Sequence, residues 1–246
     1  MVGTASGSHP LSPRAGVGDL QRFKSVLAIF PHPDDETITC GGTIRRFADV
    51  GATVSLVLLT GGARGNPSGI LDPQLKAIRR SEAQRAARIL GIARLIQEDF
   101  GDNHLREEAE QVRLSLSRTF GEVDPDLILT HDRSGLYGHP DHIACSEMVT
   151  DLRNAVLPRV PLWYVALPAM LLRTLQLAGQ MTRDQRLDAS RATPTHRLFL
   201  GTAVVAKARA VRAYRSQRGA IGKRFGRLVP PWIAVGLLPF EYFAEA

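Results

Sequence analysis

The stretch of sequence that decides the fold reads VLAIF at residues 26–30 and runs directly into PHPDDET at residues 31–37. The five apolar residues predict a buried β-strand, and the two prolines stiffen the turn that follows it. An ordinary polar turn would explain one Pro and one Asp. It does not explain a His, two Asp and a Glu close together, because adjacent carboxylates repel one another unless a cation binds between them. The turn is therefore interpreted as part of a metal site.

A second polar cluster follows another strand. Residues 127–130 read LILT and predict a buried strand, and HDRSGLYGHPDH follows at residues 131–142. The remaining apolar patterns predict strands at residues 25–30, 53–59, 95–96, 163–167 and 196–200, and helices at residues 38–50, 72–90, 107–120, 143–156 and 203–215. Thr37 is the expected cap of the first helix.

Strands that alternate with helices predict an α/β fold: a Rossmann-like, doubly wound, mostly parallel sheet with helices on both faces. Ligands of such sheets bind at the carboxyl ends of the strands, where both polar clusters are expected to meet. Residues 1–22 are rich in Gly, Ser and Pro and are expected to form a disordered tail. Residues 23–246 are expected to form a single domain with a basic C-terminal portion, and the glycine-rich residues 60–67 a mobile loop at the rim of a pocket.

The composition and net charge indicate which kinds of partner and which cellular compartment to expect. The net charge is +7, and most of the excess lies late in the chain. A basic face can bind nucleic acid or an anionic membrane, but runs of charge are more often solvated helix surfaces, and no aromatic residues interleave with these arginines. No nucleic-acid partner is therefore expected, and contact with a membrane surface is not favoured. Two cysteines are too few for a disulfide framework, and prolines interrupt the most apolar stretches, so a cytoplasmic protein is expected.

The two clusters contain the ligands that a catalytic zinc ion uses, which are three His or carboxylate side chains beside a water molecule. His32 and Asp35 can supply two ligands, and His142 or His139 the third. The ion lowers the pKa of its water towards ~7, and Asp34 is placed to take the proton as a general base. The remaining histidine would stabilise an oxyanion or protonate a leaving amine. This division of roles favours metal-assisted hydrolysis of an amide or ester.

The two motifs also resemble the signature of a known family. HPDDE at residues 32–36 and GHPDH at residues 138–142, with RRSE at residues 79–82 between them, look like the motifs of the LmbE-like, or PIG-L, deacetylase superfamily. The resemblance spans about residues 25–153. It implies a Rossmann-like fold and the removal of an N-acetyl group from an amino sugar.

The resemblance implies a metal ion bound by His32, Asp35 and His142. The ion is usually Zn²⁺ in this family, and Fe²⁺ or another divalent metal is used in some members. Asp34 would be the general base that activates the attacking water.

The resemblance also implies how the substrate is held. His139, as an imidazolium oriented by Asp141, would stabilise the oxyanion, and Tyr137 would polarise the substrate carbonyl. Arg79 would contact the substrate, and Asp102 falls near the position of a sugar-binding acid.

Several of these residues have simpler interpretations. Tyr137 can pack under its loop, and Arg79 can be an exposed helix residue that pairs with Glu82, three residues further on. Glu36 is expected to brace the turn without binding the metal. His131 has no motif support and is left out of the site.

The sequence thus predicts a metal-dependent N-deacetylase that acts on a small N-acetylglucosamine-type conjugate. An amidase of the same superfamily acting on a thiol conjugate would use the same metal chemistry. A basic nucleic-acid-binding protein with a vestigial site is a rival from another class, and the intact motif residues argue against it. An enzyme that works at a lipid surface, with its basic C-terminal third as the membrane contact, is a third alternative.

Overall fold

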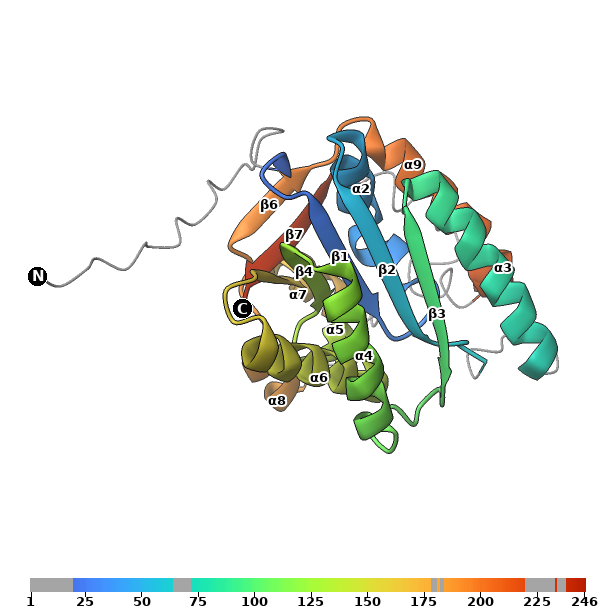
Figure 1. Ribbon diagram of the computed structural model, residues 1–246. Coiled ribbons are helices and arrows are strands. Elements are labelled where there is room, and N and C mark those ends of the chain that lie inside the picture. Colours follow the sequence, from blue (N-terminus) through green and yellow to red (C-terminus); the bar gives the residue numbers. More distant parts are fainter. Residues whose placement is uncertain (1–19, 64–71, 178–180, 182–183, 220–232, 234–237) are drawn as a thin grey trace, which may run out of the picture.

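The computed structural model describes residues 20–63, 72–177, 181, 184–219, 233 and 238–246. The described strands form one seven-stranded sheet in the order β3-β2-β1-β4-β5-β7-β6 (Figure 1). They are β1 (Ser25–Phe30), β2 (Thr53–Thr60), β3 (Arg94–Phe100), β4 (Leu127–His131), β5 (Leu162–Val165), β6 (His196–Phe199) and β7 (Phe240–Glu245). The first five are parallel, and β7 runs antiparallel between β5 and β6. The predicted α/β fold is confirmed.

Helices cover both faces of the sheet. On one face α2 (Asp35–Asp49), α3 (Asp72–Leu90) and α9 (Ala203–Ala213) pack against one another, and on the other face α4 (Ala109–Val123) packs against α6 (Pro140–Val156) (Figure 1). Three shorter helices occur along the chain between β4 and β6: α5 (Gly135–Gly138), α7 (Ala169–Leu177) and α8 (Gln185–Ser190). A 3₁₀ turn at Arg215–Gln217 follows α9. In the described part of the chain, no helix combines the length and the apolar character needed to cross a membrane.

The central strand β1 explains why the sheet has two cores. Its residues alternate between the two faces, so that Val26, Ala28 and Phe30 enter the core beneath α2 and α3, while Leu27 and Ile29 enter the core beneath α4 and α6. Because helices cover both faces, a continuous apolar run is required, and this is what the sequence shows.

The structure differs from the sequence predictions at the start of the first helix. Helix α2 begins at Asp35, so Thr37 lies within the first turn and is not its cap. Asp34 takes the capping position with a positive φ of 103°. The prediction assumed that four polar residues in a row belong to a loop, but acidic residues are stabilising at a helix N-terminus.

Other differences concern the ends of the domain. Leu20 is fully buried in the core, so the described fold begins before residue 23, and residues 1–19 of the predicted tail lie outside the described residues. Residues 64–67 of the glycine-rich loop also lie outside them. Strand β7 was not predicted, and it fills the place between β5 and β6.

Strand β7 contributes a carboxylate to the interior of α2. The helix is interrupted at Cys40, whose φ of −140° is not helical. The backbone N–H groups of Gly42 and Thr43, just beyond the interruption, donate to the carboxylate of Glu241 at 3.0 and 2.7 Å. Lys207 of α9 lies 2.6 Å from the same carboxylate, and both side chains are almost fully buried. Lys207 is therefore not part of a solvated basic surface, although it lies in the basic C-terminal portion of the chain.

Replacing Lys207 by Met is expected to lower the free energy of unfolding by about 3 kcal/mol, because the change leaves a buried carboxylate without its cation. Urea unfolding of the two proteins measures the difference. Arg209→Met is the matched control, since it removes the same charge from an exposed position of the same helix and should change stability by less than about 0.5 kcal/mol. A loss below about 1 kcal/mol in Lys207→Met would show that the ion pair contributes little.

Candidate metal centre and active site

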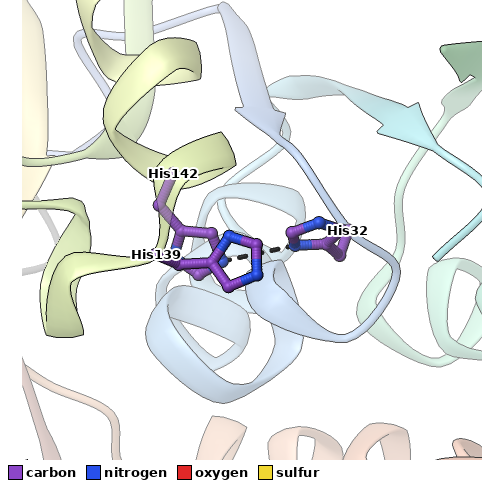
Figure 2. A group of neighbouring side chains, drawn as sticks. All are labelled: His32, His139 and His142. Carbon is purple, nitrogen blue, oxygen red and sulfur yellow. Dashed lines mark hydrogen bonds between the residues drawn. The ribbon is translucent and has the colours of Figure 1, made fainter. Parts of the chain in front are cut away.

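The turns that follow β1 and β4 lie side by side at the carboxyl edge of the sheet. The two strands are parallel neighbours, with Val26 opposite Leu127, and both lead into a polar turn. His32 comes from the first turn, and His142 comes from the first turns of α6 (Figure 2). Their ring nitrogens Nδ1 and Nε2 are 3.3 Å apart. The two clusters therefore meet as the sequence predicted.

Three donor atoms at this place fit a tetrahedral metal ion. Oδ2 of Asp35 lies 3.3 Å from Nδ1 of His32 and 3.3 Å from Nε2 of His142, so the three atoms form a nearly equilateral triangle. Zinc–ligand bonds of ~2.0–2.1 Å in tetrahedral geometry place the ligands about 3.3 Å apart. Without a cation or a proton between them, three lone pairs would repel one another in a buried site. The donor set therefore suits a divalent ion.

The second nitrogen of His32 is held by two carboxylates. Nε2 lies 3.1 Å from Oδ2 of Asp141 and 3.2 Å from Oδ1 of Asp102. An Nε2–H group that donates to these oxygens leaves the lone pair of Nδ1 directed at Asp35 and His142, which is the arrangement that orients metal-binding histidines. Asp102, predicted as a substrate ligand, thus contacts a proposed metal ligand directly.

The charges of the three donors are set by burial and by one another. Burial lowers the pKa of His142 to about 3, so its imidazole is neutral at pH 7. Burial opposes ionisation of Asp35, but His142, His131 and His32 outweigh it and hold the pKa of Asp35 well below its usual value. Burial also disfavours the charged form of His32, yet Asp102, Asp141 and Asp35 raise its pKa well above the usual value. A neutral His142 and an ionised Asp35 are the forms that bind metals, whereas a metal ion has to displace a proton from Nδ1 of His32, whose pKa is raised.

The carboxylate of Asp141, which the sequence assigned to His139, lies against Nε2 of His32, and an orienting role towards His139 stays a prediction. Besides His32, it accepts hydrogen bonds from the backbone N–H groups of Asn103 at 2.6 Å and Leu105 at 3.3 Å. The contact between Asp141 and His139 is made by the backbone: the N–H of Asp141 donates to Nδ1 of His139 at 3.2 Å. When the ring of His139 is neutral, its proton therefore lies on Nε2. Burial, followed by the charge of His32, lowers the pKa of His139.

Asp34 is next to the metal donors but is not one of the three. Its side chain is only 14% exposed, and burial raises its pKa to about 7 although the Arg79 guanidinium opposes the shift. Its backbone N–H donates to Glu36 at 3.1 Å, whose buried carboxylate also accepts from Tyr214 at 2.8 Å. Glu36 therefore braces the turn, as predicted. Asp34 also has a positive φ, which costs free energy in residues other than glycine. Non-glycine residues with this backbone conformation are often found at functional sites.

Arg79 holds the same turn from the other side. Its buried guanidinium donates to the carbonyl oxygens of Pro33 and Gly62 and lies 3.4 Å from Oδ2 of Asp34. At Gly62 φ is +65°, which strains other residues, and a Cβ atom there would also displace this guanidinium. The alternative of an exposed Arg79 paired with Glu82 is wrong, since Arg79 is 3% exposed. Contact with substrate stays a prediction.

Two aromatic rings pack against His142. The ring of Tyr137 lies edge-on to it at 4.9 Å, and the hydroxyl is 3.5 Å from Nε2. His131, which was not expected in the site, stacks on the His142 ring with centroids 4.2 Å apart and planes 3° from parallel. Its Nε2 lies 3.8 Å from Asp35. Three further combinations of side chains at this place could hold a metal ion: Asp35, His131 and His142; His32, His139 and His142; and His32, Asp102 and Asp141. The sequence did contain one sign that His131 belongs to the site: it is the last residue of β4 and the first residue of the polar cluster.

The loop that carries Tyr137 is held by two residues that the sequence did not single out for the site. The carboxylate of Asp132 accepts from the backbone N–H groups of Ser134, Leu136 and Ala192 at 3.0–3.3 Å. Arg191, whose side chain is 9% exposed, donates to the carbonyl oxygen of Leu136. These contacts fix Leu136 at a φ of +64° and so set the position of the tyrosine beside it.

Fold and site together define the class of this protein: an α/β protein with His and Asp side chains that could hold a metal ion at the carboxyl edge of its sheet, and with a further carboxylate beside them. Residues 27–152 match the family model of the GlcNAc-PI de-N-acetylases, PIG-L, and the chain belongs to this family. The resemblance noted in the sequence is thus confirmed.

Relatives and solved structures extend this result. A diacetylchitobiose deacetylase of Thermococcus kodakarensis is 40% identical over 121 residues, which are 48% of this chain and 45% of the relative. The chain spans about half the length of the first curated relatives that it matches.

The fold is shared with the N,N'-diacetylchitobiose deacetylase of Pyrococcus horikoshii, with a TM-score of 0.66 and 22% identity over 92% of this chain and 85% of that one. It is also shared with GalB of Pseudomonas putida KT2440, the 4-carboxy-2-hydroxymuconate hydratase, with a TM-score of 0.66 and 18% identity over 91% and 96% of the two chains. The fold therefore serves more than one reaction, and the activity depends on the site that the fold carries.

Proposed function

We propose that this chain is a metal-dependent hydrolase that removes the N-acetyl group from an N-acetylglucosamine-type conjugate. The observation that carries the proposal is the triangle of His32, Asp35 and His142 with the carboxylate of Asp34 beside it. Two histidines and a carboxylate suit Zn²⁺ and also Fe²⁺. The family match and the deacetylases among the relatives support an amide of an amino sugar as the substrate.

When bound, the ion would lower the pKa of a water molecule towards ~7 and polarise the amide carbonyl. Asp34 takes one proton from the water that attacks this carbonyl. A carboxyl group with a pKa of about 7 is well matched to accept that proton and to return it to the amine nitrogen when the carbon–nitrogen bond breaks. The products are then a carboxylate and an amino sugar.

The other site residues either donate hydrogen bonds to the substrate oxygen or hold another site residue in position. His139 carries its proton on Nε2 and can donate it as a hydrogen bond to the developing oxyanion, without prior protonation of the ring. Tyr137, which contacts both His139 and His142, is the second donor. Asp141 positions His32. Arg79 keeps the Asp34 carboxylate at its place on the turn.

The test is acetate release from a panel of N-acetylglucosaminides by metal-loaded and by chelated protein. We expect turnover with the loaded protein, loss of turnover on chelation, and recovery when Zn²⁺ or Fe²⁺ is restored. An N-acylated thiol conjugate of glucosamine belongs in the same panel. Cleavage of that amide alone would identify the amidase alternative, and a loaded protein that cleaves no amide in the panel would contradict the proposal.

A further inference from the structure

An apolar cavity of about 180 Å³ lies beside the proposed active site. It opens between the first turns of α2, the loop that carries Tyr137, the end of β5, α7 and the start of β7. Most of its walls are hydrocarbon side chains, among them Ile38, Leu136, Val165, Leu171, Leu175 and Met181. None of the described residues of α7 is fully buried although the helix is largely apolar. Its leucines at positions 171 and 175, one turn apart on the same side of the helix, face the cavity and do not close it.

The cavity and the proposed metal centre share a wall. Tyr137 lines the cavity, and its hydroxyl is 3.5 Å from Nε2 of His142. Ile38 lies three residues after Asp35 on the first turn of α2, and Val165 pairs with His131 in the sheet. An occupant of the cavity would therefore lie directly beside the place where the scissile amide has to bind.

Three polar side chains of the wall are already bonded within the protein. Lys207 and Glu241 pair with each other at 2.6 Å, and the hydroxyl of Thr39 donates to the carbonyl oxygen of Asp35 at 2.7 Å. These groups are satisfied by the fold, so the cavity offers a ligand chiefly hydrocarbon contact. A dry apolar cavity of ~150 Å³ is large enough for a benzene molecule, whereas the methyl of an acetyl group fills much less.

We propose that this cavity binds an apolar group of the substrate, so that the preferred conjugates carry a hydrocarbon group of about six carbon atoms or more. The group is either the N-acyl chain or the aglycone of the amino sugar, since both start within reach of the amide. This inference rests on the proposed function and adds a substrate class to it.

Two substrate series separate the two sources. One lengthens the N-acyl chain of a methyl glucosaminide from acetyl to octanoyl, and the other keeps the N-acetyl group and lengthens an alkyl aglycone from methyl to octyl. In at least one series kcat/KM should rise by up to about fourfold for each methylene group that enters the cavity, and by tenfold or more by six carbons. The series that rises identifies the group, and no rise in either series would overturn the proposal.

Variants of α7 test whether the cavity causes the rise. Leu175→Trp fills the cavity and should abolish the gain while the acetylated methyl glycoside is still hydrolysed at a rate within about twofold of the wild type. Leu171→Trp is the second filling variant, should the first fail to fold. Leu177→Trp is the matched control, because Leu177 is 76% exposed on the same helix and lies outside the cavity. A gain that survives in both filling variants would contradict the proposal.

Calorimetric binding of hexyl glucosaminide, which has no acyl group to lose, separates this inference from the proposed function. Tighter binding to the wild type than to Leu175→Trp, with no hydrolysis of any substrate, would support the cavity and refute the hydrolase. Equal hydrolysis of short and long substrates would support the hydrolase and refute the cavity.

Discussion

Asp34→Asn should lower the rate of amide hydrolysis by at least ~100-fold and leave the metal in place. Asp34 is not one of the three donor atoms, so its replacement does not change the metal-binding group. Its largely buried carboxyl group has a pKa raised to about 7, which suits it to accept a proton from water and to return it to the leaving amine. The side-chain amide of asparagine has the same shape as the carboxylate but cannot accept the proton. The loss of activity should therefore appear in kcat.

Asparagine is chosen because it should leave the backbone conformation at this position unchanged. Asp34 has a φ of 103°, and Asn is among the few residues that tolerate positive φ. Asp124→Asn is the matched control, because Asp124 also has a positive φ, of 45°, and is exposed at the end of α4, far from the site. Metal content by elemental analysis and kcat by acetate release give the result. A Asp34→Asn protein that turns over within tenfold of the wild type would remove Asp34 from the role of base.

The centre of the fold could be predicted from the sequence because its signals are local. Residues 26–30, 53–59 and 127–130 are apolar runs that only a sheet covered on both faces can bury. Once these strands are parallel, the turns that follow them must lie at one edge. The meeting of His32 and His142 is therefore a consequence of topology, and it needed no knowledge of side-chain positions.

The contacts of individual carboxylates could not be predicted in this way. GHPDH places Asp141 two residues after His139, and the family resemblance assigned the Asp141 carboxylate to that histidine. The structure gives the carboxylate to His32, 109 positions earlier in the chain, because the first turn of α6 directs it towards the β1 turn. Sequence spacing fixes where a residue lies on its own element, but not which partner from another element reaches it.

Strand β7 escaped prediction for a related reason. Its residues 240–245 read FEYFAE, a short pattern with two acids. The strand is stable because Glu241 binds two backbone N–H groups of α2 some 199 positions away and because Lys207 neutralises it. The compensating partners lie on two other elements, so nothing near residue 241 in the sequence signals them.

His32→Ala is expected to abolish both metal binding and turnover. The change removes one of three donors, and Asp35 and His142 alone leave the ion with mostly water ligands. After dialysis the variant should retain less than about a tenth of an equivalent of Zn²⁺. Zn²⁺ should raise the melting temperature of the wild type, because a ligand that binds only the folded state stabilises it, and should not raise that of His32→Ala.

Three further variants test which side chains hold the ion. Asp141→Asn removes a charge that positions His32 and should weaken metal affinity by ~10–100-fold, the usual effect of changing a residue that supports a ligand. His104→Ala changes a histidine outside the proposed metal group, which pairs with Glu107, and should bind a full equivalent. Full metal content in His32→Ala, together with loss of metal in His131→Phe, would instead place the ion on Asp35, His131 and His142. The stacked ring of His131 would then be a ligand. Asp34 would have to act on a water molecule bound to an ion that lies closer to the end of β4.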